Sequence, residues 1–272
     1  MTMPKNPTMA EHFGWKLHPF SDTYQLPQPF SSQRDQRITD QALSLLSYGK
    51  SFAITGPSGS GKSTLIQHLM ANLDSNYYLP ILIHYGGLQR NAVLKTVADM
   101  LGVETNGRAV PLLVKLQKHM AEISTGTNPL HPVIVIDDAQ LLERQSFMDL
   151  CSLIVCPPKK NAAASLIFLG DETLAKQLNL TVMTPIQSRL TTNFHTEPLN
   201  EEETYQFISL RLKHAKAPKD LFEPDALPLV AAHCRGNRRQ IMNTATMLIH
   251  EAFDRKEQTI CSQLLINSDV LS

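Results

Sequence analysis

The chain has 272 residues, of which 42% are apolar and 18% are charged, and its 25 basic side chains are balanced by 25 acidic ones. This length predicts one large domain, or a large domain with a small one. The charge balance excludes a histone-like coat of positive charge, although a local basic stripe could still bind nucleic acid. The composition also excludes collagen, coiled-coil and wholly disordered chains.

Neither a secretory signal nor an apolar run long enough to cross a membrane is present, so we expect a soluble protein of the cytoplasm with no membrane contact. The four cysteines lack the CxxC spacing and the histidine pair of a zinc site. We expect buried free thiols, which suit a reducing compartment. They are Cys151, Cys156, Cys234 and Cys261.

Residues 1–30 combine five prolines with scattered aromatic side chains, which predicts an extended arm that packs on a domain. From Ser32 the apolar spacing is helical, and Gly49 ends the helix. The short apolar run 51–55 predicts a buried strand. It leads directly into the glycine-rich segment GPSGSGKST and then into a further helix.

The alternation of strands and helices continues through the middle of the chain. Apolar runs predict strands at 79–85, 132–137 and 165–170, and helical spacing predicts helices at 92–101, 111–124 and 141–155. Parallel strands need helical crossovers, so repeated units of this kind predict a parallel sheet covered by helices on both faces. The fold class is therefore α/β.

After Pro198 only helices are predicted. Asn200 and Glu203 form a capping-box pattern before the first of them, and two more helices are expected at 224–234 and 238–255. We therefore divide the chain into three parts. They are an extended N-terminal arm (1–30), an α/β nucleotide-binding domain (31–198) and a small C-terminal helical lid (199–272).

Residues 56–63 match the pattern G-x-x-x-x-G-K-[ST] between a strand and a helix. Glycines let backbone N–H groups curl around phosphate oxygens, and the helix N-terminus adds its dipole. We expect Lys62 to reach the β and γ phosphates of ATP and Ser63 to bind Mg²⁺. The predicted nucleotide-binding residues are Gly56, Pro57, Ser58, Gly59, Ser60, Gly61, Lys62, Ser63 and Thr64.

Two aspartates follow the predicted strand 132–137. Asp137, at the end of that strand, is expected to hold magnesium together with Ser63. Asp138 stands where related ATPases usually carry a glutamate that polarises the attacking water. An aspartate is shorter by one methylene, so slow hydrolysis is a possible consequence; the alternative is that both aspartates only cap the next helix.

The chain resembles the AAA+ ATPases of the ExeA, TniB and TnsC group, which includes helper ATPases of bacterial transposons. The resemblance covers roughly residues 13–253. Besides the glycine-rich segment, the motifs that carry it are FGWKLHPF, IDDAQ, FLGDETL, PIQSRL followed by FHTEPLNEEET, and CRGNRRQI. It implies a P-loop AAA+ fold and hydrolysis of ATP to ADP and phosphate.

The resemblance also implies roles for single residues. Arg189 corresponds to the arginine that reaches into a neighbouring subunit's ATP site, and Arg239 to the lid arginine of the second sensor, with Arg238 as an alternative. Each could instead be an ordinary surface arginine. Asp171 stands at the first-sensor position, where the family usually carries a neutral side chain.

Arg90 and Arg108 resemble positions that face the central DNA in rings of helper ATPases. Lys159 and Lys160 are a further candidate patch, and all four could be ordinary solvated charges. Repeated around a ring, one or two such residues per subunit would suffice to follow a phosphate backbone.

These expectations combine into a hypothesis of function. The chain would be an ATP-dependent, DNA-binding regulator that forms a homo-oligomeric ring or filament on double-stranded DNA and recruits a separately encoded transposase. The alternative is a secretion-associated ATPase of the ExeA type. Those proteins usually carry a membrane span and a peptidoglycan-binding region, neither of which we expect in this chain. Replication-initiation, clamp-loading and signalling ATPases remain further alternatives.

Overall fold

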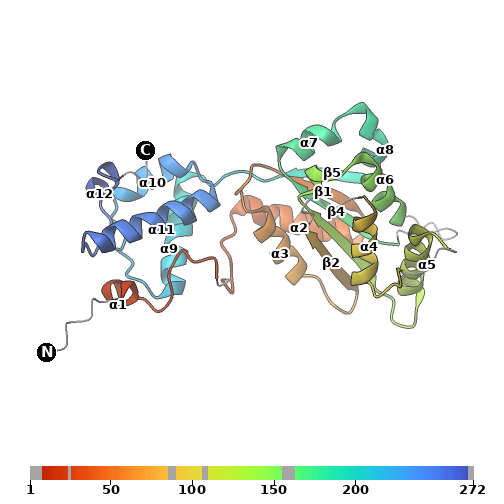
Figure 1. Cartoon of the computed structure of the whole chain (residues 1–272), viewed down its shortest axis with the longest axis horizontal. Helices are drawn as coiled ribbons and strands as arrows, with labels where there is room; N and C mark the ends of the chain where they lie inside the picture. The colour runs from red at the N-terminus through yellow and green to blue at the C-terminus, as the bar shows by residue number, and fades with distance from the viewer. Residues whose placement is uncertain (1–7, 24–25, 85–89, 106–109, 155–162, 269–272) are drawn as a thin grey trace. The chain divides into compact units, whose positions relative to one another are not determined.

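The computed structural model describes residues 8–23, 26–84, 90–105, 110–154 and 163–268. The chain forms two compact units (Figure 1). The sheet unit consists of Gln33–Pro57 and Lys62–Thr196. The helical unit consists of Met1–Ser32, Ser58–Gly61 and Glu197–Ser272, so four residues of the glycine-rich segment pack with it.

A five-stranded parallel sheet forms the centre of the sheet unit, in the order β2-β3-β4-β1-β5. The strands are β1 (Ser51–Thr55), β2 (Tyr78–His84), β3 (His131–Asp137), β4 (Ser165–Gly170) and β5 (Leu190–His195). Four of them were predicted. The fifth was missed because β5 is a sheet-edge strand with alternating exposure and the largely polar sequence LTTNFH, rather than an apolar run.

Helices cover both faces of this sheet (Figure 1), as predicted. The helices on one face are α2 (Gln33–Ser47) and α3 (Lys62–Ala71), and those on the other are α4 (Arg90–Met100), α5 (Leu112–Thr125) and α6 (Arg144–Leu153). The helix expected at 141–155 begins only at Arg144, because Ala139–Leu141 form a short 3-10 helix, η1.

Three short helices between β4 and β5 were not predicted. They are α7 (Glu172–Leu178), η2 (Thr181–Met183) and α8 (Thr184–Gln187). Their brevity leaves no long helical periodicity to detect.

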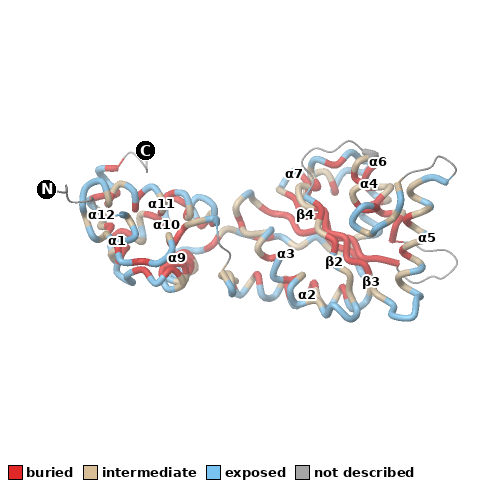
Figure 2. Tube along the Cα trace, turned by 60° about the horizontal axis from the view of Figure 1, so that its bottom comes forward, coloured by how far each residue is buried: buried red, intermediate tan, exposed pale blue. Residues whose placement is uncertain are grey.

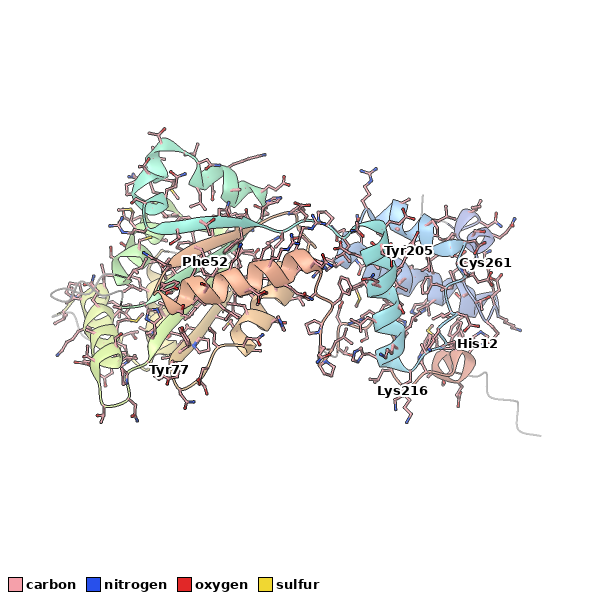
Figure 3. The ribbon with its side chains drawn as sticks, turned by 180° about the vertical axis from the view of Figure 1, so that it is seen from behind. His12, Phe52, Tyr77, Tyr205, Lys216 and Cys261 are labelled. Carbon is pink, nitrogen blue, oxygen red and sulfur yellow. The ribbon has the colours of Figure 1, made fainter. Side chains whose placement is uncertain are left out.

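The strand side chains alternate between two apolar layers, as the period of two requires. Ala53 and Phe168 pack in the layer below α4, α5 and α6. Phe52, labelled in Figure 3, and Ile167 pack in the layer below α2 and α3. Figure 2 shows the central strands as the buried part of this unit. This rigid sheet fixes the positions of the residues at the carboxyl ends of its strands.

The helical unit contains α1 (Met9–Phe13), α9 (Glu201–Ala215), α10 (Ala226–Cys234), α11 (Arg238–Asp254) and α12 (Ser262–Ile266). The predicted capping box is confirmed: Glu203 N–H donates to Asn200 Oδ1 over 2.8 Å, and Asn200 N–H donates to Glu203 Oε2 over 2.9 Å. In the described part of the chain, no helix has the length and apolar character needed to cross a membrane.

The N-terminal arm is part of the helical unit's core. Phe13, Trp15 and Phe20 are buried there. The buried guanidinium of Arg211 donates to the carbonyl oxygens of Pro19 (2.8 Å) and Ser21 (2.7 Å), which anchors the segment after the tryptophan. The expectation of a purely extended arm was wrong at α1, where Thr8 and Glu11 form a capping box.

The cysteines follow the expectation in part. Cys151 and Cys234 are buried free thiols, and burial raises the pKa of the Cys151 thiol to about 11. Cys261 is partly exposed, and Cys156 lies outside the described residues.

Candidate functional site

The glycine-rich segment connects β1 to α3, as its sequence predicted, and Ser63 and Thr64 lie in the first turn of α3. Two of its glycines permit close approach by other residues. A Cβ atom on Gly59 would lie 2.1 Å from Asn237 Oδ1, and one on Gly61 would lie 2.2 Å from an Arg238 guanidinium nitrogen. Both glycines also have positive φ angles, so the loop requires glycine at these positions.

The ammonium group of Lys62 already lies against this loop. Its Nζ donates to the carbonyl oxygens of Gly56 (2.8 Å) and Pro57 (2.9 Å). These partners hold the cation within the curl of the backbone, where a phosphate oxygen could replace a carbonyl as its partner.

Contacts within the helical unit orient the middle of the loop. Asn237 Nδ2 donates to Ser58 O over 2.8 Å, and Arg238 N–H donates to Gly59 O over 3.0 Å. In a trans peptide the N–H points opposite to the C=O. The N–H groups that follow these carbonyls, on Gly59 and Ser60, therefore point away from α11.

Asn237 was not predicted as a site residue. Its Oδ1 caps α11 by accepting from the N–H groups of Arg239 and Gln240, both over 3.1 Å, while its Nδ2 binds the loop. The glycine–asparagine pair before the helix in CRGNRRQI is a typical helix-start signal, which could have identified the cap but not its loop contact.

The two candidate arginines of the helical unit, Arg238 and Arg239, lie next to the glycine-rich loop. Arg239, the predicted second-sensor residue, is exposed, and its guanidinium donates to Ser58 Oγ over 3.3 Å. The alternative, Arg238, is buried, with its guanidinium against Gly61 and 5.9 Å from the ring centre of Phe30.

The two residues predicted to hold magnesium are brought together from distant parts of the chain. Ser63 Oγ donates to Asp137 Oδ2 over 3.5 Å, and Asp137 lies at the carboxyl end of β3. Hydroxyl and carboxylate oxygens are ligands that Mg²⁺ prefers, so this pair could hold the metal beside the phosphate loop.

His84, at the end of β2, is a neighbour of both aspartates that sequence reasoning missed. Its Nδ1 lies 3.5 Å from Asp137 Oδ2, and its Nε2 lies 3.4 Å from Asp138 Oδ2. Among the described residues, these three side chains offer ligand atoms within 4.8 Å of one another. The parallel register that pairs His84 with Asp137 brings them together.

Asp138 directly follows β3 and has a left-handed backbone conformation, with φ at 54°. Its side chain makes no capping hydrogen bond to η1, which argues against the simple capping interpretation. Instead, Gln140 Nε2 donates to Asp138 Oδ1 over 3.1 Å. The carboxylate is thus held between Gln140 and His84, at the same sheet edge as Asp137.

The remaining predicted residues lie elsewhere or are not described. Asp171 caps α7, because its Oδ1 accepts from Thr173 N–H over 2.7 Å. Arg189 is exposed in the turn between α8 and β5 and donates to Pro185 O. Arg90 opens α4, but its side chain is outside the description. Arg108, Lys159 and Lys160 lie outside the described residues.

Comparisons with known proteins agree with this fold. The family described as AAA domain matches residues 45–178. The chain is 21% identical to general secretion pathway protein A of Aeromonas hydrophila, over 94% of this chain and 51% of that protein. It therefore spans about half the length of this curated relative.

Two solved structures are similar in fold. Cdc6p from Pyrobaculum aerophilum has a TM-score of 0.70 at 16% identity, covering 89% of this chain and 67% of that one. The Aeropyrum pernix ORC1 protein, solved in complex with DNA, has a TM-score of 0.65 at 17% identity, covering 89% and 66%. The matched AAA domain, the parallel sheet and the phosphate loop together show that the chain has the P-loop AAA+ fold.

Proposed function

We propose that the protein is an ATP-dependent, DNA-binding regulator that assembles on duplex DNA in the cytoplasm and recruits or activates a separately encoded transposase. The observation that carries the nucleotide part is the meeting of Lys62, Ser63, Asp137 and Asp138 beside the glycine-rich loop. The transposition part rests on the motifs shared with helper ATPases of bacterial transposons.

Each residue has a definite task in this proposal. The loop N–H groups bind phosphate oxygens, while Lys62 exchanges its carbonyl partners for the β and γ phosphates. Ser63 and Asp137 would hold Mg²⁺, which would supply positive charge to neutralise the phosphates. Asp138 orients the attacking water, and Arg189 from a neighbouring subunit stabilises the charge of the transferred phosphoryl group. Arg239 adds positive charge near Ser58.

The neutral net charge supports oligomerisation as the switch for DNA binding. A monomer with balanced charge has little general attraction for DNA, so affinity has to come from aligning a few arginines of several subunits. Arg90 and Arg108 are the residues proposed for this contact. The structure of ORC1 in complex with DNA is a precedent within the same fold.

The test is fluorescence anisotropy of a labelled duplex across a salt series, with ATP, with ADP and without nucleotide. We expect tight binding only or mainly with ATP, little sequence preference and a steep loss of affinity with salt, because the contacts are to phosphates. Replacing Arg90 and Arg108 with alanine should weaken DNA binding while ATP affinity stays nearly unchanged. Equal, weak binding in all three nucleotide states would defeat the DNA-binding proposal.

A second candidate is a secretion-associated ATPase of the ExeA type. The match to general secretion pathway protein A, over 94% of this chain, favours it. It predicts ATP hydrolysis that does not respond to duplex DNA. An ATPase rate that rises with added duplex would favour the DNA-binding regulator instead.

A further inference from the structure

We propose that Gln140 is a positioning residue for ATP hydrolysis, which holds the carboxylate of Asp138 and couples it to the start of α7. The inference rests on the proposed role of Asp138 as the residue that orients the attacking water. It adds a second residue of the IDDAQ motif to that task and a route by which α7 can affect it.

Asp138 needs such support because of its own geometry. Its side chain is shorter by one methylene than the glutamate usual in related ATPases, and 40% of it is exposed to solvent. An exposed carboxylate has several rotamers available, whereas a water-orienting group must keep one. The hydrogen bond of 3.1 Å from Gln140 Nε2 to Asp138 Oδ1 favours one rotamer, in which His84 Nε2 lies 3.4 Å from the other carboxylate oxygen.

The other end of the Gln140 amide contacts the β4–α7 connection. Gln140 Oε1 faces the backbone N–H of Asp171 at 3.4 Å. A backbone N–H can only donate, so it fixes the oxygen on that side and turns the NH₂ group toward Asp138. The main-chain carbonyl of Gln140 also accepts from Gln177 Nε2, in α7, over 3.0 Å.

The end of β4 leaves room for this arrangement. A Cβ atom on Gly170 would lie 2.7 Å from Gln140 Oε1 and 2.6 Å from a methyl carbon of Leu174. Only glycine lets the amide and α7 approach the strand end together. Gln140 thus contacts both Asp138 and the start of α7, and these contacts restrict its side chain.

The contacts give α7 a connection to the site. Asp171 both caps α7 and contacts Gln140, so a movement of the first turn of α7 displaces the amide that holds Asp138. The chain continues from α7 through η2 and α8 to Arg189. Assembly with a neighbour through this segment would therefore affect Asp138 as well as deliver Arg189.

The test compares Gln140→Glu and Gln140→Ala with the wild type. Glutamate keeps the acceptor for Asp171 N–H but sets a carboxylate against Asp138, and alanine removes both contacts. We expect kcat to fall by about ten- to a hundred-fold in both, while the calorimetric Kd for ATP and the Tm change little. Gln145→Glu is the matched control, because Gln145 also donates to an aspartate, Asp149, over 3.2 Å on an exposed helix face; its kcat should be unchanged.

Hydrogen exchange tests the coupling without measuring activity. In the wild type, ATP binding should change the exchange of backbone amides in residues 172–178, and Gln140→Ala should lose that change at the same ATP occupancy. Unchanged kcat in both Gln140 variants, or an exchange response of α7 that survives in Gln140→Ala, would overturn the proposal.

Asp138→Asn separates this proposal from the one on which it rests. If Asp138→Asn abolishes turnover while the Gln140 variants remain fully active, only the role of Gln140 fails. If Asp138→Asn itself is fully active, the assignment of the water-orienting residue fails first.

Discussion

At the scale of single residues, we expect Lys62 to have the most direct effect on nucleotide binding. Its ammonium donates to two loop carbonyl oxygens, and a bound phosphate would replace these neutral partners with charged phosphate oxygens. Lys62→Ala should abolish measurable ATP binding while Tm stays close to that of the wild type. Titration calorimetry on folded protein is the measurement, and unchanged ATP affinity would remove this residue from the site.

Asp138 should separate hydrolysis from binding. Asparagine tolerates the left-handed backbone found at this position, so Asp138→Asn should fold normally. The variant retains Ser63 and Asp137, so we expect ATP affinity within about two-fold of the wild type and turnover lower by about a hundred-fold or more. A phosphate-release assay beside calorimetry checks both, and a fully active variant would show that another group orients the water.

The sequence alone could predict those residues of the candidate site that belong to one continuous segment or directly follow a recognisable strand. The glycine-rich loop and Lys62 lie in one segment, and the position of Asp137 after an apolar strand makes it a candidate metal ligand. His84, Gln140 and Asn237 were missed for a physical reason. His84 depends on the register between β2 and β3, Gln140 on its approach to the end of β4, and Asn237 on a contact between residues far apart in sequence.

At the scale of secondary-structure elements, the N-terminus of α11 should control the phosphate loop. Asn237→Asp keeps the acceptor that caps α11 but replaces the donor to Ser58 O with a repelling carboxylate oxygen. Loss of this hydrogen bond, plus the new negative charge near the phosphates, should weaken ATP binding by about ten-fold or more.

Asn200→Asp provides the matched control, because Asn200 caps α9 in the same way by accepting from Glu203 N–H. Aspartate is as good a helix cap as asparagine, so we expect the Tm of both variants to stay close to that of the wild type. Equal ATP affinity in both variants, measured by calorimetry, would contradict a role for Asn237 at the loop.

The arm gives the helical unit a dependence on pH. Burial, followed by the charges of His250 and Arg211, lowers the pKa of His18. The unfolded chain therefore binds the proton on this histidine more readily than the folded chain does. The contribution of neutral His18 to the free energy of unfolding is complete above the ordinary pKa of about 6.5, and it is lost as pH falls through the lower pKa of the folded state. Protonation also removes the acceptor for Phe20 N–H at His18 Nδ1.

We therefore expect the helical unit to unfold at a lower temperature at about pH 5 than at about pH 7.5. Trp15 is the only tryptophan of the chain, and its ring centre lies 5.3 Å from that of His18, so its fluorescence reports this region. His18→Asn keeps an acceptor but cannot titrate in this range, and it should flatten the pH dependence. An equally steep dependence in that variant would assign the effect to another group.

Element prediction succeeded where periodicity is long and failed where the segments are short or polar. The apolar strands β1, β3 and β4 and the long helices α2 and α11 appear close to their expected bounds. The polar edge strand β5 and the short helices α7 and α8 carry no such pattern. Sheet order itself follows from long-range pairing, which no local pattern contains.

At the scale of the whole molecule, the proposal requires shared active sites. Arg189→Ala should leave ATP binding by the monomer intact but weaken ATP-dependent assembly and reduce hydrolysis, since an arginine supplied by a neighbour is worth on the order of 10³ to 10⁵ in rate. In a mixture with Lys62→Ala protein, a subunit with intact Lys62 can meet an intact Arg189 from its neighbour. Part of the activity should then return, and no recovery at any mixing ratio would contradict sharing.

Sedimentation velocity of the protein with a labelled duplex tests the central claim most directly, because it detects assembly and DNA binding in one experiment. The label is followed with a slowly hydrolysed ATP analogue, with ADP and without nucleotide. The account predicts that the duplex moves as a large protein–DNA assembly only with the analogue, and that Lys62→Ala abolishes this species. A duplex that sediments as free DNA under all three conditions would contradict it.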